Sequence, residues 1–457
     1  MNKSGGKYPV KNGEIIELSI SGMNHEGEGV GKYHGLTVFV PFALPEDQLT
    51  VQIEEVKKSY ARGKVLEYLS FSDYRNESEC SSYEECGGCQ LQHYDYGRQL
   101  IFKREIVQNA LERIAKQKGV NVLPVIGMKT PIMYRNKAEY PVRVIDRTLK
   151  AGFFASKSRV FVTLDGTCLI QHPLVEKTRE TFMSICNQWD LKDRFLEASF
   201  HRLVIRVGVF SGEAMIVICS EKPVPGIETV CGRLISEMPQ IKSVYQNTGK
   251  KESSNCLGQG LNLIMGKSSI REKIGSLEFD ISPGSFFQVN SVQGEVLFSK
   301  TVEYAGCRGL AVDAYCGTGG ISLNLAQEAE KVYGFEVYPD AVKDARHNAA
   351  VNEVENVEFI QGDAAVTLKD LHGIKPETIV IDPPRRGCDE RVLQSIVGLQ
   401  PEKIVYVSCN PATLARDLKV LADRDYAVAE VQPIDMFPQT YHTESVCLLE
   451  RGESIDK

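Results

Sequence analysis

The feature that most constrains the fold is an alternation of apolar strand segments and helical segments from about residue 307 onward. Candidate helices at 321–329 and 340–351 separate short runs that are rich in β-branched residues. Those runs are 310–313, 332–335, 357–360, 378–381 and 404–407. Because parallel strands need a crossover helix between them, this order predicts a doubly wound, Rossmann-like α/β domain.

Residues suited to a nucleoside ligand follow four of these strands. The glycine-rich loop 313–320 turns from the first strand into a helix, and Glu336 ends the second strand, where a carboxylate can accept both ribose hydroxyls. Asp363 and Asp382 follow the third and fourth strands, although Asp363 alone would also suit an ordinary turn. The loop lacks the third glycine that a dinucleotide requires. The set therefore favours S-adenosylmethionine over NAD.

Cys409 is the candidate nucleophile of this domain. It follows the fifth strand and precedes Pro411 and a predicted helix over 412–421, so we expect a thiolate stabilised at a helix N-terminus. Cys316 and Cys388 also lie near strand ends and remain alternatives. Cysteines such as Cys186, Cys219, Cys231 and Cys307 are expected to be buried and inert.

A thiolate suits methylation of uracil at carbon-5, which is a poor nucleophile by itself. Addition of the thiolate to carbon-6 makes carbon-5 nucleophilic, and a base must later remove the carbon-5 proton. Glu444 precedes a predicted strand over 445–449 and is the candidate base, although a lone glutamate is usually a solvated surface charge.

The N-terminal part predicts a small β barrel. Strand-like runs at 15–20, 36–40, 48–56 and 62–69 surround a stretch in which Gly27, Gly29, Gly31 and Gly35 suggest turns. About five short strands in this length are typical of oligonucleotide-binding barrels, and an SH3-like barrel would give the same pattern.

The central part mixes elements, with a helix predicted over 98–118 and strands over 203–210 and 214–219. Apolar residues at helical spacing are expected to share one face of that helix: Ile101, Ile106, Val107, Ala110, Leu111 and Ile114. The division that follows is a barrel over 1–72, a central α+β domain over 73–275 and a methyltransferase domain over 276–457.

A basic stretch runs from Arg135 to Arg159, although the net charge of the chain is −7. Phosphate binding needs positive charge only where the backbone lies, so Arg135 and Lys137 are candidate RNA contacts. Aromatic residues interleave with the charges, as stacking on unpaired bases would require, namely Tyr134, Tyr140, Phe153 and Phe154. A shorter basic patch surrounds Tyr60, and a solvated charged face is the alternative for both.

Three cysteines, Cys80, Cys86 and Cys89, are closely spaced in a polar loop, as the ligands of a metal or cluster would be. A reducing compartment disfavours disulfides among the 13 cysteines, which points to metal binding or catalysis instead. A fourth ligand must come from elsewhere, and spacing alone leaves Cys168 open against His93 or His172, which would make a zinc site.

The chain resembles the RNA uracil-5-methyltransferase family. The motifs that carry the resemblance are Ser-Phe-Phe-Gln-Val-Asn at 285–290, the 313–320 loop, Asp-Pro-Pro-Arg at 382–385, Ser-Cys-Asn-Pro at 408–411 and His-Thr-Glu at 442–444. The barrel is similar to the TRAM domain of the ribosomal branch, and Tyr134-Arg-Asn-Lys137 also fits.

This resemblance implies residue roles. Cys409 would be the nucleophile and Glu444 the proton acceptor. The S-adenosylmethionine contacts would be Gln288, Tyr315, Gly320, Glu336 and Asp382, with Gly320 acting through its backbone. The strand-end pattern described above adds Gly317 and Asp363 to this set. The ribosomal members also imply a [4Fe-4S] cluster on Cys80, Cys86, Cys89 and Cys168, with zinc as the alternative.

The expected activity is methylation of a specific uridine, in 23S ribosomal RNA for preference and in transfer RNA as the alternative. An amino-group methyltransferase is a weaker reading, because Arg385 stands where those enzymes usually carry an aromatic residue. A non-catalytic iron-sulfur RNA-binding protein is another. The sequence has no apolar run of transmembrane length, so we expect a cytoplasmic monomer without a membrane or obligate protein partner.

Overall fold

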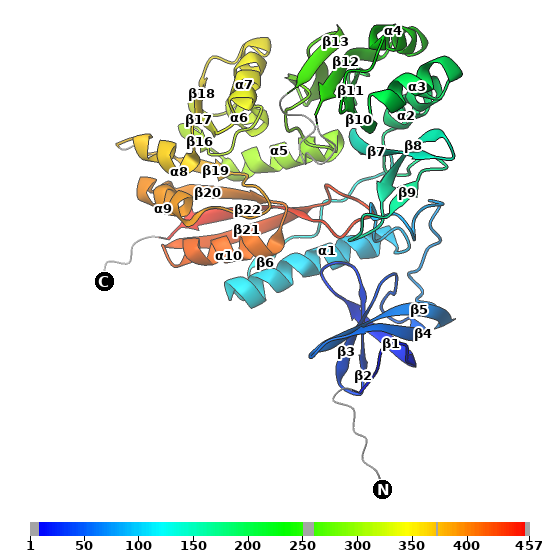
Figure 1. Cartoon of the computed structure of the whole chain (residues 1–457). Coiled ribbons are helices and arrows are strands. Elements are labelled where there is room, and N and C mark those ends of the chain that lie inside the picture. The colour runs from blue at the N-terminus through cyan, green and yellow to red at the C-terminus, as the bar shows by residue number, and fades with distance from the viewer. Residues whose placement is uncertain (1–8, 250–259, 372, 453–457) are drawn as a thin grey trace.

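The computed structural model describes residues 9–249, 260–371 and 373–452. Figure 1 shows a small N-terminal barrel, a long helix α1 (Tyr96–Ala110) beside it, a central sheet, and a C-terminal sheet with helices on both faces. Within the described ranges, no helix combines the length and the apolar character that a membrane span requires.

The N-terminal barrel is closed and has the strand order β1-β2-β3-β5-β4. Its strands are β1 (Ile15–Met23), β2 (Gly29–Tyr33), β3 (Leu36–Val40), β4 (Gln48–Val56) and β5 (Tyr60–Ser70). The predicted five-stranded barrel is confirmed, but Gly29 and Gly31 lie in a strand and not in turns. A Cβ atom would come within 2.7 Å of Ala43 at position 29 and within 2.7 Å of Leu18 at position 31. These glycines therefore allow close packing inside a narrow barrel.

The central sheet has seven strands in the order β13-β12-β11-β10-β7-β8-β9. They are β7 (Lys137–Ile145), β8 (Thr148–Phe154), β9 (Phe161–Thr163), β10 (Phe200–Val207), β11 (Ala214–Ser220), β12 (Ile241–Thr248) and β13 (Leu261–Gly266). Helices α2 (Pro173–Cys186), α3 (Trp189–Glu197) and α4 (Ile227–Glu237) accompany it. All of β11 is buried, as its continuous apolar sequence requires.

The C-terminal sheet has eight strands in the order β18-β17-β16-β19-β20-β22-β21-β6. The first five are parallel, whereas β22 runs antiparallel between β20 and β21. Their bounds are β16 (Leu310–Asp313), β17 (Lys331–Glu336), β18 (Val357–Gln361), β19 (Thr378–Ile381), β20 (Lys403–Ser408), β21 (Tyr426–Ile434), β22 (Glu444–Arg451) and β6 (Asn121–Val122). The predicted doubly wound domain is confirmed.

Six helices belong to this C-terminal part among the described residues. They are α5 (Ser291–Ala305), α6 (Gly320–Leu325), α7 (Pro339–Val351), α8 (Ala364–Thr367), α9 (Glu390–Leu399) and α10 (Pro411–Ala422). The boundary that we place near 275 falls at Gly275, the turn between β14 (Ile270–Ile274) and β15 (Leu277–Ile281). This hairpin contributes to the core that α5 and the C-terminal sheet share.

Helix α1 and strand β6 lie within 73–275 in sequence but pack on the C-terminal sheet. Val107, Leu111 and Val122 share one buried core with Tyr406 and Leu418, and β6 pairs with β21. A short π-helical turn (Leu111–Ala115) continues α1. The predicted single apolar face is therefore only partly right: Val107 and Leu111 are buried, whereas Ile101 and Ile114 are 49% and 41% exposed.

Candidate active site

The pairing of two C-terminal strands brings Cys409 and Glu444 to the same end of the sheet. Ser408 of β20 lies opposite Ser445 of β22 in the antiparallel pair. Cys409 is the next residue on one strand and Glu444 precedes Ser445 on the other, so the two face each other across the pair. Cys409 is partly exposed, whereas Glu444 is buried.

Helix α10 begins directly after Cys409. The side chain of Asn410 caps the helix by accepting the backbone N–H of Ala412 at 3.0 Å, and Pro411 occupies the first turn. Asn410 Nδ2 and Thr413 Oγ1 each donate to the backbone oxygen of Arg385 at 3.2 Å. These contacts hold the loop after β19, and with it Arg385, at the start of α10.

The electrostatic environment of Cys409 differs from the prediction. Burial, followed by the charges of Glu444 and Asp382, raises the pKa of the Cys409 thiol to about 11, and the positive charge of Arg385 acts in the opposite direction. This raised pKa contradicts the expectation of a thiolate stabilised by the helix N-terminus. Two neighbouring carboxyl groups and loss of solvent outweigh the helix end.

Three carboxyl groups on neighbouring strand ends influence one another. Burial raises the pKa of Glu444 well above its usual value, and the charge of Asp382 adds to this rise. Burial and the charge of Asp313 raise the pKa of Asp382 to about 7. The pKa of Asp313 itself is raised to about 6 by burial, although the Ser322 hydroxyl donates to it at 2.7 Å. Burial therefore favours the neutral forms of these three carboxyl groups.

A cavity of about 190 Å³ lies at the ends of β16, β17 and β18 and brings together three of the predicted cofactor residues, Tyr315, Glu336 and Asp363. Glu336 accepts hydrogen bonds from the backbone N–H groups of Gly317 at 3.2 Å and Tyr338 at 2.9 Å, which orients its carboxylate. Asp363 also caps α8 through Ala365 N at 2.9 Å. Asp363 therefore serves the turn into α8, as the alternative interpretation expected, and also lines the cavity.

Gly320, Gln288 and Asp382 do not line that cavity. Gly320 is the first residue of α6, where a Cβ atom would approach the Phe298 ring to 2.8 Å, so close packing of α5 explains the missing side chain. Gln288 is buried ahead of α5, and its backbone oxygen accepts from Asn136 Nδ2 at 2.9 Å.

The four candidate ligand cysteines, Cys80, Cys86, Cys89 and Cys168, line a second cavity of about 620 Å³. Burial raises the pKa of Cys89 to about 12, with smaller contributions from the other three thiols. The backbone N–H of Cys168 donates to buried Glu176 at 3.0 Å, which fixes its loop. No three His, Cys, Asp or Glu side chains within 9–249, 260–371 and 373–452 are arranged to hold a metal ion.

The two histidines considered for a zinc site have other surroundings. His172 caps α2 by accepting from Leu174 N at 3.2 Å through Nδ1. His93 Nδ1 pairs with the Tyr83 hydroxyl at 2.5 Å, and burial lowers the pKa of His93 to about 3. Neither ring lines the cavity that the four cysteines line.

Arg135 and Lys137 line the same cavity as the cysteines, together with Arg385 and His442. Arg135 Nε donates to Lys137 O at 3.2 Å, and Lys137 lies 3.0 Å from a carboxylate oxygen of Glu139.

The prediction that Tyr134 and Tyr140 stack on bases is wrong, because both side chains are buried. Tyr134 and Tyr140 are 5% and 0% exposed. Their hydroxyls donate inward, from Tyr134 to the Pro438 carbonyl at 3.0 Å and from Tyr140 to Glu176. Phe153 lines the cysteine cavity and Phe154 is partly exposed, so only these two rings have access to a ligand.

A cleft of about 940 Å³ contains Cys409 together with residues that the sequence did not associate with the site. Cys409 and His442 lie in it beside one face of α1, which contributes Arg98 and Ile101, and beside Arg113 of the π-helical turn that continues α1. The barrel supplies the opposite wall, residues 21–26 and Pro45. The sequence signal for this wall was the row of apolar residues predicted on one face of α1, of which Ile101 is 49% exposed and lines the cleft.

Comparison with known proteins decides the family. Residues 262–452 match the model described as tRNA (Uracil-5-)-methyltransferase, and residues 9–66 match the TRAM domain. An uncharacterized RNA methyltransferase of Halalkalibacterium halodurans is 41% identical over 450 residues, which cover 97% of this chain and 98% of that protein. The chain belongs to the RNA uracil-5-methyltransferase family. The family resemblance inferred from the motifs is thus confirmed.

Two further proteins extend this result over nearly the whole chain. An uncharacterized RNA methyltransferase of Caldanaerobacter subterraneus is 44% identical over 450 residues, with 97% of this chain and 99% of that protein covered. The crystal structure of Pyrococcus abyssi tRNA (uracil-54, C5)-methyltransferase in complex with S-adenosyl-L-homocysteine is similar at 27% identity. Its TM-score is 0.73, with coverage of 95% of this chain and 100% of that one. In the chain described here, the TRAM match at residues 9–66 covers barrel strands β1 to β4 and the first part of β5.

Proposed function

We propose that this chain transfers a methyl group from S-adenosylmethionine to carbon-5 of a uridine in RNA, through a covalent bond between Cys409 and the base. The observation that carries the proposal is the position of Cys409 opposite Glu444 at one end of the C-terminal sheet, within a cleft that reaches the barrel. Membership of the uracil-5-methyltransferase family supports it.

The 190 Å³ cavity fits the nucleoside part of S-adenosylmethionine. Glu336 points a carboxylate, already oriented by two backbone N–H groups, to where ribose hydroxyls would bind, and Tyr315 offers a ring for the base. Gln288, Gly320 and Asp382 are proposed as further contacts on family resemblance, and Gly317 on its place in the glycine-rich turn beside Glu336. When bound, S-adenosylmethionine supplies an electrophilic methyl group on a sulfonium.

Cys409 would add to carbon-6 of the uracil after giving up its proton. Because the pKa of the thiol is raised to about 11, attack requires either a high pH or a substrate whose binding places positive charge nearer the sulfur. Arg385 already lowers the pKa of the thiol, and substrate binding that moved its guanidinium closer to the sulfur would lower this pKa further.

Carbon-5 then takes the methyl group and still holds its original proton. Glu444 would remove that proton, after which the carbon-5 to carbon-6 double bond re-forms and the Cys409 thiolate leaves. Because burial raises the pKa of Glu444, the ionised form that accepts the proton becomes more abundant as the pH rises.

RNA would approach along the two clefts that meet at Arg385 and His442. Both residues line the 620 Å³ cavity and the 940 Å³ cleft. Arg135 and Lys137 are proposed to contact RNA phosphates in the first cavity. Their replacement by alanine is expected to flatten the salt dependence of RNA binding, and an unchanged slope would argue for a purely structural role.

The cysteine cavity is proposed to hold a [4Fe-4S] cluster. The chemistry of the donors suits a cluster, because four free thiols from two distant chain segments line one cavity that neither His93 nor His172 lines. Within the described residues these thiols do not form a metal-holding group, so cluster binding would have to bring them together. Cys80, Cys86, Cys89 and Cys168 would be the ligands. The cluster would join the 80–89 loop to the loop of Cys168 and so stiffen the wall that carries Arg135.

Ribosomal RNA is the proposed substrate, and transfer RNA is the second candidate because the similar Pyrococcus abyssi enzyme acts on tRNA. Purified protein, with S-adenosylmethionine carrying a labelled methyl group, should label ribosomal RNA at uridine, as 5-methyluridine. Labelling of transfer RNA alone would replace the ribosomal proposal. Binding of RNA without methylation of either would favour a non-catalytic RNA-binding protein.

A further inference from the structure

A fully buried ion pair links the first half of the chain to the segment that precedes Glu444. Lys103 of α1 and Asp435 are both 0% exposed, and the Lys103 ammonium contacts Asp435 Oδ1. The ammonium also donates to the Phe437 carbonyl at 3.0 Å, and the Tyr96 hydroxyl donates to Asp435 Oδ2 at 2.9 Å. Both charges are thus satisfied within the protein.

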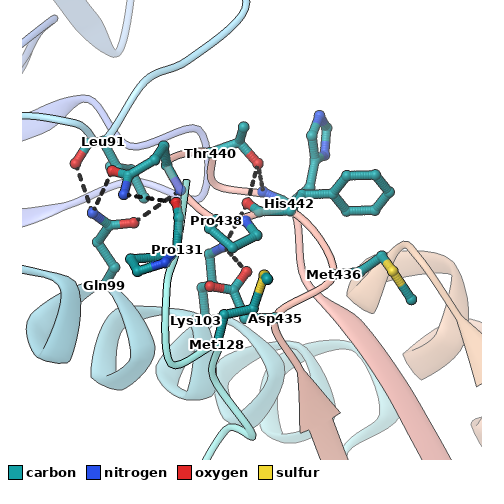
Figure 2. A network of polar contacts seen from close by, with 12 residues as sticks. Leu91, Gln99, Lys103, Met128, Pro131, Asp435, Met436, Pro438, Thr440 and His442 are labelled. Carbon is teal, nitrogen blue, oxygen red and sulfur yellow. Dashed lines mark hydrogen bonds and ion pairs between the residues drawn. The ribbon is translucent and has the colours of Figure 1, made fainter. Parts of the chain in front are cut away.

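The 435–443 segment connects β21 to β22 and has no regular secondary structure. Its path must therefore be fixed by contacts from other elements. Figure 2 shows Gln99 and Lys103 reaching from α1 toward it, with Thr440 and His442 farther along the same segment. Gln99 Nε2 donates to Gln439 Oε1 at 3.0 Å, and Gln99 Oε1 accepts a hydrogen bond from the backbone N–H of Gln439 at 3.2 Å.

Contacts from two other directions complete the attachment. Asn290, the cap of α5, donates to the Met436 carbonyl at 3.1 Å, and Gln293 donates to the Asp435 carbonyl at 3.2 Å. The Tyr134 hydroxyl donates to the Pro438 carbonyl at 3.0 Å. The segment is therefore held from α1, from the start of α5 and from the stretch that carries Arg135.

The 435–443 segment contributes lining residues to both cavities near the proposed reaction site. Phe437, Thr440 and His442 line the cysteine cavity, and His442 also lines the cleft that contains Cys409. The residue that follows the segment is Glu444, the proposed base. A shift of the segment would change the angle at which this carboxylate meets carbon-5.

We propose that Lys103 and Asp435 form a positioning device that holds the 435–443 segment so that Glu444 is aligned with the proton it removes. This inference rests on the proposed function. A buried ion pair is a poor source of stability, since an apolar pair of similar volume often replaces it without loss. Its directional contacts to Phe437 and Tyr96, in contrast, cannot be reproduced by apolar side chains.

The test uses the double variant Lys103→Met/Asp435→Leu, because either single change would leave an unpaired buried charge and risk misfolding. Arg104→Met is the matched control: Arg104 is the next residue on α1, and it holds the Val122 carbonyl at 2.6 and 2.9 Å instead of the 435–443 segment. Single-turnover reactions measure formation of the protein–RNA adduct and its release separately. Amide hydrogen exchange reports the protection of residues 436–443.

The double variant should form the adduct at nearly the wild-type rate but release it about tenfold to hundredfold more slowly, as expected for a misplaced catalytic group. Exchange of the 436–443 amides should also rise. Arg104→Met should change neither measurement. Equal slowing of both steps, or unchanged exchange in the double variant, would overturn the positioning role.

Failure of the proposed function itself would look different. If Glu444→Gln, in which the ion pair is intact, traps no methylated adduct, Glu444 is not the base and the inference falls with that assignment. If Glu444→Gln traps the adduct while the double variant releases product normally, only the inference fails.

Discussion

At the scale of single residues, the site is defined by one thiol among opposing charges. Asp382 and Glu444 disfavour the Cys409 thiolate, and Arg385 favours it. Arg385 is held in place through its backbone oxygen, which accepts from Asn410 and Thr413, and these two hydrogen bonds do not involve its guanidinium group. The balance predicts that the nucleophile of the free protein is largely protected from adventitious alkylation at neutral pH.

Replacement of Arg385 should shift the titration of Cys409. Arg385→Met removes the positive charge that lowers the pKa of the thiol, so the pKa should move above its present value of about 11. The rate of iodoacetamide labelling at Cys409, followed by mass spectrometry between pH 8 and pH 10, should fall severalfold at each pH. Arg386→Met is the control. Faster labelling in Arg385→Met would contradict the charge assignment.

The position of Cys409 at the end of the sheet could be predicted from the sequence, but the environment of its thiol could not. Cys409 was identified by its place after the fifth strand, and the structure does put it at the end of the sheet. Its raised pKa depends on Asp382 and Glu444, which other strands bring near, and no local pattern encodes that proximity. The base-stacking prediction for Tyr134 and Tyr140 failed for the same reason, because the burial of a side chain depends on tertiary packing.

At the scale of elements, the turn from β16 into α6 shapes the proposed cofactor cavity. Gly319 caps α6 with φ of +90°, a region that residues with a side chain rarely adopt, and a Cβ atom there would lie 3.0 Å from the Phe359 ring. Two glycines of the 313–320 loop are thus required for different structural reasons. Gly319 meets a backbone requirement, whereas Gly320 makes room for Phe298.

Gly319→Ala should destabilise the protein by about 1–3 kcal/mol, because the new Cβ atom must be held at a positive φ. The measurement is urea unfolding followed by circular dichroism. Gly232→Ala is the control, since Gly232 lies in α4 with nothing within 4 Å of an added Cβ atom. That change should stabilise the helix by about 0.5–1 kcal/mol. A Gly319→Ala protein as stable as wild type would contradict the strain argument.

The elements of the parallel sheet were predictable because period and order are local signals. Strands β16 to β20 lie where the apolar runs predict them. Strand β6, in contrast, has only two residues and acquires its role from pairing with β21, more than three hundred residues away. Helix α1 likewise packs away from its sequence neighbours, which composition alone cannot indicate.

At the scale of the whole molecule, helix α1 is the connection between the parts. One face packs on the C-terminal sheet, the other lines the cleft that the barrel closes, and Lys103 reaches the 435–443 segment. Lys157 of the central part also pairs with Glu26 of the barrel at 2.7 Å. RNA bound in the cleft would therefore contact the barrel, α1 and the site of Cys409 at once.

The cysteine cavity gives a prediction at this scale. Protein purified without oxygen should be brown and contain iron and sulfide, and replacement of Cys80, Cys86, Cys89 or Cys168 by alanine should abolish the colour. Cys186→Ala, which removes a buried thiol of the α2 helix, should leave the colour unchanged. One equivalent of zinc without iron would show that the cavity holds zinc instead.

The most direct test of the account compares Cys409→Ala with Glu444→Gln. Cys409→Ala removes the group that attacks carbon-6, so it should neither methylate RNA nor form an adduct. Glu444→Gln keeps attack and methyl transfer but lacks the base for release. It should accumulate a protein–RNA complex that survives denaturing gel electrophoresis and carries the methylated base. A Cys409→Ala protein that still methylates uridine, or an adduct mapped to Cys316 or Cys388, would contradict the account.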